Sequence, residues 1–453
     1  MAEPHDLAIV GGGPAGQAAA LALAGLGLRI AVVDEQARPG GQILRQPPAS
    51  FSVANWLPGS DHHWLKDQAA RFTALTEVEW IGRHSVIEIA RTGGSFALLA
   101  EGPDGIRPIA AHRVLIAGGC QDLAVPVPGW TLPGVYAAGG IQAFLKSQRF
   151  IPGDRIVLAG THPLQLLIAA QIVAAGGSVA AVLFAQKRGA MIGAMIARPW
   201  IAARHVLTLR TAAAATLALK RAGVPVRFGA RLEAIGGVDA VTGVRAGGPA
   251  IACDTVGLCY GFVPQSILPR MAGAAMRPAG HAGGWAAVHD AWMRASIPGL
   301  CVAGETTGVA GAPAAAAGGT IAGLGIARDL ALLDPAEADR RAAPVRAHHA
   351  RLLGFAALLE DLADPRGFLP TLGDDTIVCR CEDVNLGALV PEFGGSANGI
   401  KLATRCGMGP CQGRNCEPSL LRLMADAGRP GDPGFTQRFP ARPVPLADLA
   451  DPA

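Results

Sequence analysis

The chain has 453 residues, more than a single hydrophobic core usually organises, so we expect two or three domains. Of its residues 50% are apolar and 16% are charged, and its net charge of +4 is spread without a basic block, which gives no support for nucleic-acid binding. The N-terminus lacks a charged segment followed by an apolar run and a cleavage site, which favours a cytoplasmic location.

The chain opens with the pattern of a nucleotide-binding unit. The apolar run DLAIV (6–10) predicts a buried strand, GGGPAG opens a helix, and RIAVVDE predicts the next strand. Three glycines in G-x-G-x-x-G spacing make the tight turn, let the backbone approach a pyrophosphate, and allow close helix–strand packing. The helix N-terminus offers N–H groups and partial positive charge to the phosphates. The predicted binding residues of this turn are Gly11, Gly13, Pro14, Ala15 and Gly16.

An acidic residue ends the second predicted strand. Asp34 is expected to accept hydrogen bonds from a ribose, and Glu35 is the alternative if the strand ends one residue later. FAD is favoured over NAD because ARPGGQILRQ follows the acid and CVAGE ends a late strand, as in glutathione-reductase-like flavoproteins. The other residues expected at this cofactor are Gly41, Gln42, Gly118, Gly304 and Glu305.

A second strand–helix–strand pattern begins at Arg155, but its nucleotide turn is incomplete. The turn reads GTHPLQ (160–165), so only the first glycine is present and His162 stands where the backbone should meet a pyrophosphate. The next strand ends in Gln186, with no acid for a ribose. NAD(P)H binding is therefore not expected, although the cations at 187–188 leave an adenine nucleotide phosphate open as an alternative to plain surface charge.

Two nested nucleotide-binding units, the first completed by a late segment, predict an α/β fold with two dinucleotide-binding domains of the glutathione-reductase type. The uncharged stretches 164–186 and 306–327 are rich in Ala and broken by Gly, which indicates buried helices of this fold and no transmembrane segment. The expected segments are an FAD-binding part (1–150), a degenerate nucleotide-binding domain (151–265), a part that closes the FAD domain (266–334), a helical connector (335–370), and a cysteine domain with its tail (371–453).

Five of the nine cysteines gather between residues 379 and 416, whereas Cys120 and the other three have apolar, strand-like neighbours and are predicted to be inert core residues. The C-x-C and C-x4-C spacings offer the four thiolates that a [2Fe–2S] cluster needs. Zinc is the main alternative, but its sites more often use C-x2-4-C. The spacing does not choose between Cys406 and Cys416, because each lies five residues from Cys411.

These motifs carry a resemblance to known families. CRCE with GMGPCQGRNC resembles the bacterioferritin-associated-ferredoxin-like (BFD-like) [2Fe–2S] domain. That resemblance implies Cys379, Cys381, Cys411 and Cys416 as the metal ligands and makes Cys406 an extra thiol. The whole chain, including PVPGWTLPGVYAAGG, is similar to the FAD-containing A (α) subunit of heteromeric opine oxidases, to the hydrogen cyanide synthase B subunit, and to the α subunits of D-hydroxyproline and L-proline dehydrogenases.

The resemblance implies a heteromeric enzyme that oxidises the C–N bond of an amino acid, an opine or a related secondary amine. A D-amino-acid-oxidase-like β subunit would hold the substrate, and electrons would pass, through FMN at the subunit interface, to the cluster and FAD of this chain. A small ferredoxin-like third subunit occurs in some relatives. Two other hypotheses stay open: a self-contained NAD(P)H-dependent reductase, and a non-enzymatic cluster-binding regulatory module. No catalytic residue is predicted, because the substrate pocket is expected on the partner.

Overall fold

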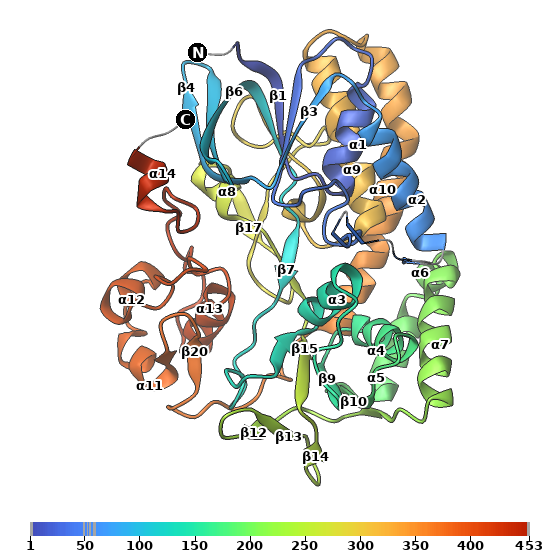
Figure 1. The fold of residues 1–453 in the computed structure, drawn as a ribbon, viewed down its shortest axis with the longest axis vertical. Helices are drawn as coiled ribbons and strands as arrows, with labels where there is room; N and C mark the ends of the chain where they lie inside the picture. Colours follow the sequence, from blue (N-terminus) through green and yellow to red (C-terminus); the bar gives the residue numbers. More distant parts are fainter. Residues whose placement is uncertain (1–2, 49, 52, 54–55, 58–59, 451–453) are drawn as a thin grey trace.

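The computed structural model describes all residues except 1–2, 49, 52, 54–55, 58–59 and 451–453 (Figure 1). A first sheet carries the N-terminal nucleotide turn. Its parallel part has the order β3-β2-β1-β6-β19, and β4 and β5 extend it as an antiparallel meander on β6. The strands are β1 (His5–Val10), β2 (Ile30–Asp34), β3 (Val78–Gly82), β4 (Ser85–Thr92), β5 (Ser95–Gly102), β6 (Gly105–Ile116) and β19 (Leu300–Val302).

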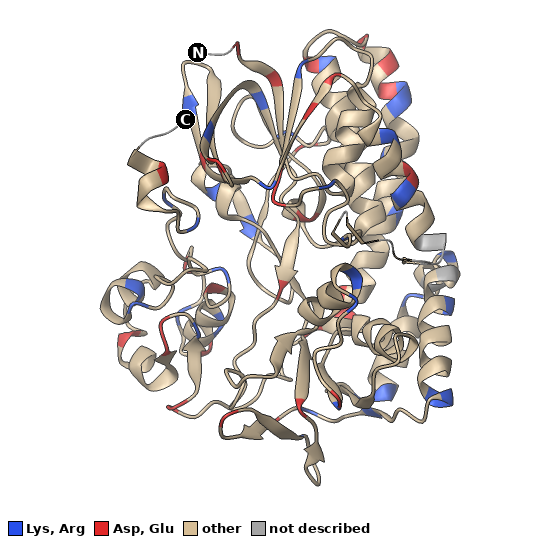
Figure 2. Cartoon of the chain, in the orientation of Figure 1, with Lys and Arg blue, Asp and Glu red and all other residues tan. Residues whose placement is uncertain are grey.

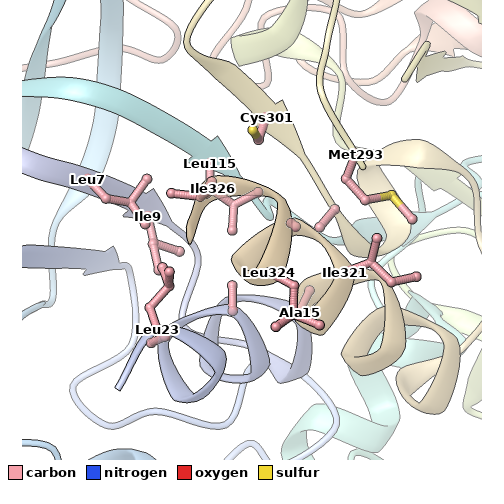
Figure 3. Close-up of a cluster of buried hydrophobic side chains, with 14 of the residues drawn as sticks. Leu7, Ile9, Ala15, Leu23, Leu115, Met293, Cys301, Ile321, Leu324 and Ile326 are labelled. Atoms are coloured by element: carbon pink, nitrogen blue, oxygen red, sulfur yellow. The ribbon is translucent and has the colours of Figure 1, made fainter. Parts of the chain in front are cut away.

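Helices α1 (Pro14–Leu23), α2 (Ser60–Thr73) and α9 (Ala312–Asp329) belong to this first domain. Figure 3 shows the core between α1, α9 and the sheet, a single buried cluster to which Leu7, Ile9 and Leu115 of the strands and Ile321 and Ile326 of α9 belong. Small residues bring the two helices into contact, because a Cβ on the glycine at 319 would lie 2.0 Å from the carbonyl oxygen of the alanine at 15. The late helix therefore packs directly on the helix that opens with the nucleotide turn.

A second sheet is wholly parallel, with the order β11-β10-β9-β15-β8. Its strands are β8 (Val135–Ala137), β9 (Ile156–Gly160), β10 (Val179–Phe184), β11 (Val226–Phe228) and β15 (Thr255–Cys259). Its helices are α3 (Ala138–Ser147), α4 (Leu164–Ala174), α5 (Arg188–Ala197), α6 (Pro199–Arg204) and α7 (Val206–Arg221). Because β8 pairs with β15, this second domain begins before the boundary expected at residue 150. A small antiparallel sheet joins β12 (Ala234–Gly237), β13 (Val241–Arg245) and β14 (Ile251–Ala252).

The two domains are joined by the antiparallel pair β7 (Cys120–Asp122) and β16 (Phe262–Pro264). The chain then returns to the first domain through α8 (Ile267–Met271), β17 (Met276–Pro278), β18 (Trp285–Ala287) and a 3-10 turn at Gly304–Thr307. This architecture confirms the expected fold with two dinucleotide-binding domains. None of the described helices combines the length and apolar character needed to cross a bilayer.

A long helix, α10 (Pro335–Ala363), leads to the C-terminal cysteine domain. That domain contains β20 (Ile377–Cys379), β21 (Val384–Asn385), α11 (Leu386–Leu389), a 3-10 turn at Val390–Glu392, α12 (Ala397–Thr404) and α13 (Glu417–Asp426). The tail, which ends in α14 (Leu446–Ala450), crosses back to the first domain (Figure 1). There the N–H of Ala441 donates to the carbonyl oxygen of Ile87 at 2.8 Å, and Arg442 pairs with Glu101 at 3.0 Å.

Candidate cofactor and metal sites

The N-terminal nucleotide turn is closed by backbone at two glycines and open at the third. Gly11 has φ +106°, and a Cβ there would lie 2.3 Å from the carbonyl oxygen of Ala117. A Cβ on Gly16 would lie 1.9 Å from the carbonyl oxygen of Gly11. Beside Gly13 the nearest atom would be 3.7 Å away, on Gly41. The turn therefore leaves its free space at Gly13, where a pyrophosphate would approach the start of α1.

The acid at the end of β2 faces this turn. Asp34 accepts hydrogen bonds from the N–H groups of Gly12 and Gln36, each at 2.6 Å. Burial raises the pKa of Asp34, although these two N–H donors act to lower it. Glu35 is exposed and points elsewhere, since it accepts from the Ser85 hydroxyl at 2.9 Å and lies 3.5 Å from Arg442 of the tail. Asp34 is therefore the better placed of the two predicted ribose ligands.

The predicted flavin-side residues are connected through a cysteine. The amide of Gln42 donates to the carbonyl oxygen of Cys120 at 3.2 Å, and the Cys120 thiol donates to Glu305 at 2.8 Å. The other oxygen of Glu305 accepts from the N–H of Gly311, just before α9, at 3.3 Å. Burial raises the pKa of Glu305 and, together with that carboxylate, the pKa of Cys120. Cys120 is thus half-buried and bonded to two residues of the predicted flavin site, and it is not the inert core residue that its apolar neighbours predicted.

The predicted flavin-side glycines lie beside a buried polar group that has no partner in the described chain. Gly304 has φ +69° and touches the first turn of α1, because a Cβ there would lie 2.9 Å from that of Ala15. Around Gly118 a Cβ would meet nothing closer than 3.7 Å, and one of the two atoms at that distance is the Thr306 hydroxyl oxygen. That hydroxyl is buried and has no hydrogen-bond partner in the described chain. A polar atom of a bound cofactor would supply the hydrogen-bond partner that this buried hydroxyl lacks.

The turn of the second domain is satisfied by the protein itself. The His162 ring accepts a hydrogen bond from the N–H of Leu164 at 3.2 Å, Pro163 has no N–H, and the N–H of Gln165 bonds to the carbonyl of His162 at 3.3 Å. Burial lowers the pKa of His162 to about 4, which keeps the ring a neutral acceptor at pH 7. The first turn of α4 therefore lacks the free donors with which α1 can meet a phosphate.

The C-terminal end of α10 covers this second turn. The Thr161 hydroxyl donates to the carbonyl oxygen of Ala363 at 2.6 Å. Gln186, at the position of a ribose-binding acid, donates to the carbonyl oxygens of Leu362 at 2.7 Å and Thr161 at 2.8 Å. Helix-terminal carbonyls carry partial negative charge, so they repel the pyrophosphate that this position would bind in an intact motif. These contacts leave little room for a pyrophosphate at this turn, and the absence of NAD(P)H binding stays a prediction.

Three of the five C-terminal cysteines meet in the third site, and the other two lie beside them. The Sγ atoms of Cys379, Cys406 and Cys416 lie within 4.8 Å of one another, and all three residues are buried. Cys411 hydrogen-bonds to Cys416 and Cys381, which extends the group to the half-buried pair. Hydrogen bonds from Cys406 and Cys416 lower the pKa of Cys379 to about 2. Of the four predicted ligands, Cys379 and Cys416 belong to this buried trio, and Cys381 and Cys411 lie beside it. The third member of the trio is Cys406, which was predicted to be an extra thiol.

Glycines shape the loop around these thiols. Gly407 has φ +87°, and its N–H points at the sulfur of Cys379 at 3.4 Å. A Cβ on either Gly407 or Gly413 would lie 2.5 Å from the Phe435 ring, and one on Gly409 would lie 2.3 Å from the Cβ of Cys381. Closely spaced sulfur ligands with an N–H directed at one of them suit a thiolate-bound iron–sulfur cluster.

The cysteine domain is hydrogen-bonded to strand β7 and to Arg270 of α8. Gln121 of β7 donates to the carbonyl oxygen of Arg414, in the loop between the last two cysteines, at 2.7 Å. Arg270 forms two hydrogen bonds with Glu417 at 2.8 and 3.0 Å, and their side chains are only 11% and 9% exposed. Sequence reasoning gave no signal for these contacts, because the partners are 147 or more residues apart.

Comparisons with known proteins give a consistent result. The family model described as pyridine nucleotide-disulphide oxidoreductase matches residues 5–319. The A subunit of opine oxidase from Rhizobium meliloti is 34% identical over 99% of this chain and 88% of its own length. Hydrogen cyanide synthase subunit HcnB of Pseudomonas protegens is 30% identical over 97% of this chain and 96% of its own. The structure of L-proline dehydrogenase from P. horikoshii shares the fold, with a TM-score of 0.70 at 19% identity over 99% of this chain and 80% of that one.

Proposed function

Because the chain belongs to the family of the opine oxidase A subunit and hydrogen cyanide synthase subunit HcnB, among the flavin-dependent oxidoreductases, we propose that it is the electron-transferring component of a heteromeric amine dehydrogenase or oxidase. Its substrates are amino acids, opines or related secondary amines, whose C–N bond is oxidised on a D-amino-acid-oxidase-like partner subunit. FAD binds at the N-terminal turn, a [2Fe–2S] cluster binds at the cysteine loop, and FMN lies at the subunit interface.

The observation that carries this proposal is the course of strand β7. At its start, Cys120 contacts Gln42 and Glu305, which belong to the predicted flavin site. The next residue, Gln121, is bonded to the backbone of Arg414, within the loop that carries the last two cysteines. A single strand thus contacts residues of both predicted redox sites through hydrogen bonds. This arrangement supports electron exchange within the chain.

The residues of this chain would position the cofactors and adjust their surroundings, since flavin and iron–sulfur groups supply the one- and two-electron chemistry themselves. Asp34 would hold the adenosine ribose, and the free N–H groups of α1 would hold the neighbouring pyrophosphate of the dinucleotide. Glu305 would remain near the flavin in a buried setting that raises its pKa, which limits the negative charge there. Gly407 would donate its N–H to a cluster ligand.

The two other hypotheses are less well supported. A self-contained NAD(P)H-dependent reductase needs a second nucleotide turn with free donors, and here His162 and α10 use those donors or cover them. A purely regulatory cluster module has no need for the nucleotide turn at Gly13 or for the acid that faces it. The adenine-nucleotide alternative for the second domain meets the same obstacle at α4 as NAD(P)H.

The proposal is tested by purifying the chain without oxygen and measuring its flavin, iron and acid-labile sulfide. We expect stoichiometric FAD with two irons and two sulfides, the composition of one [2Fe–2S] cluster. Cys416→Ala should lose iron and retain FAD. The matched variant Cys406→Ala should retain both if the ligands are Cys379, Cys381, Cys411 and Cys416, as the family resemblance implies, even though Cys406 lies within 4.8 Å of the sulfurs of Cys379 and Cys416. A wild-type chain without iron and sulfide would refute the electron-transfer role, and loss of iron from Cys406→Ala would revise the ligand set.

A further inference from the structure

Helix α5 is apolar, yet none of its residues is buried. Its sequence, RGAMIGAMIA, places Ile192 and Ile196 at the surface, where they are 40% and 70% exposed. A ten-residue helix is only marginally stable alone in water, and helices of this length are normally stabilised by packing one face against a neighbour. An apolar helix with no buried residue is therefore a surface that a further molecule is expected to cover.

The exposed residues continue into the next helix as a ridge. Ile192 and Ile196 are one turn apart on α5, and Trp200 follows the break at Arg198 as the second residue of α6, where it is 80% exposed. Gly189 and Gly193 of α5 have open surroundings, because a Cβ on either would meet nothing within 4 Å. We call Ile192, Ile196 and Trp200 the α5–α6 ridge. The large apolar side chains can insert into a partner protein, and the glycines beside them let the backbone of that partner come close to α5.

The chain segment that carries the α5–α6 ridge has charges of one sign, although Asp361 of α10 lies beside it. Residues 187–231 contain nine Lys or Arg and no Asp or Glu. Along α7, Figure 2 accordingly shows blue and no red. Of the nine, only Arg198 forms an ion pair within the described chain, with Asp361. The cations are Lys187, Arg188, Arg198, Arg204, Arg210, Lys220, Arg221, Arg227 and Arg231. An excess of cations around an apolar ridge indicates a partner surface that is apolar at its centre and acidic at its rim.

We propose that the α5–α6 ridge is the docking surface for the partner subunit, an inference that rests on the proposed function. Seven of the nine cations are arginines, which form planar two-point pairs with carboxylates and are enriched in protein interfaces, where lysine is depleted. A protein with an apolar groove and Asp or Glu at its rim fits this surface better than an anionic lipid layer, for which lysine would serve equally well. The subunit names of the relatives agree with such a partner.

The test uses the tagged full-length chain purified from its native source. The wild type should carry a second polypeptide in a fixed ratio, and the double variant Ile196→Ser/Trp200→Ser should recover about ten-fold less of it, as expected on losing central apolar anchors. Val238→Ser is the matched control, since Val238 is 88% exposed on the β12–β13 turn and lies outside the ridge. FAD content should be equal in all three chains, which shows that the fold is intact.

The outcomes separate this inference from the proposed function. If the double variant keeps its partner at the wild-type ratio, the partner docks elsewhere and the inference is wrong, while the heteromeric enzyme stands. If the wild type purifies alone, the heteromer itself fails. Binding of the wild type, but not the double variant, to phosphatidylglycerol vesicles with no protein partner recovered would overturn the inference in favour of a lipid surface. Reversing one charge, as in Arg204→Glu, should weaken the complex most at low salt.

Discussion

Gly13 is the position where cofactor binding can be separated from folding. An added Cβ at Gly13 has 3.7 Å of clearance, and the backbone there is extended, so alanine causes no clash within the protein. We expect Gly13→Ala to fold with a stability loss below about 1 kcal/mol but to lose most of its FAD, because the methyl group enters the pyrophosphate space. Flavin content and thermal unfolding of the purified variant measure the two effects.

The comparison variant is Gly16→Ala, whose Cβ would lie 1.9 Å from the carbonyl oxygen of Gly11. Since that contact is with backbone, the helix start must shift, and both stability and FAD should be lost. Retention of full FAD by Gly13→Ala would show that the dinucleotide does not approach the turn there.

The sequence alone does not tell which of two neighbouring acidic residues at the end of a strand faces the nucleotide turn. Asp34 and Glu35 both carry a carboxyl group, and the strand end is uncertain by one residue in any sequence-based assignment. Successive side chains on a strand point to opposite faces, so only the observed strand end decides which acid meets the turn. The partner of the other acid, Arg442, is about 400 residues away and carries no local signal.

At the scale of elements, the start of α4 should make stability depend on pH. His162 has a pKa lowered to about 4, whereas an unfolded histidine titrates near its ordinary value of 6.5. Between these values the unfolded chain binds a proton that the folded chain does not, so stability falls as the pH drops from 6.5 to 4 and is fully present above 6.5. The loss attributable to this ring is at most about 3 kcal/mol.

We expect His162→Asn to be less sensitive to acid than the wild type, because asparagine can still accept the N–H of Leu164 but does not titrate. The measurement is the urea midpoint of both proteins at pH 7 and pH 5, and the difference between the two pH shifts isolates the ring from all other groups. Equal shifts would mean that His162 is accessible to protons in the folded chain.

The same region shows how element-scale prediction succeeds and fails. The incomplete motif GTHPLQ could be recognised because nucleotide turns have fixed spacing, and the strands and helix around it follow from their apolar pattern. That the end of α10 closes this turn could not be predicted. Leu362 and Ala363 are ordinary residues, 176 and 202 positions away from Gln186 and Thr161, whose side chains bind their carbonyl oxygens. Long-range carbonyl contacts leave no pattern in composition or period.

At the scale of the whole molecule, the attachment of the cysteine domain depends on a buried ion pair. Glu417 directly follows Cys416, so Arg270 of the first domain holds the residue next to a proposed cluster ligand. Arg270 also donates to the carbonyl oxygens of Pro433 and Phe435, at the start of the tail. One guanidinium thus fixes both the helix that follows the cysteine loop and the segment that covers it.

Removing this guanidinium should loosen the cysteine domain without emptying it. Arg270→Ala leaves Glu417 buried and unpaired, which typically costs about 3–5 kcal/mol, and we expect that cost to fall on the docking of the domain. Limited proteolysis should cleave faster in the segment between α10 and β20, while iron and FAD contents stay unchanged. Arg270→Lys should be cleaved at a rate between those of the wild type and Arg270→Ala, because lysine keeps the charge but not the two-point geometry.

The control variant is Arg245→Ala. The side chains of its ion pair with Glu233 are 65% and 45% exposed, so the rate of cleavage should not change. If Arg270→Ala is cleaved no faster than this control, the strand contacts at Gln121 alone hold the two redox sites together, and the ion pair is dispensable for their alignment.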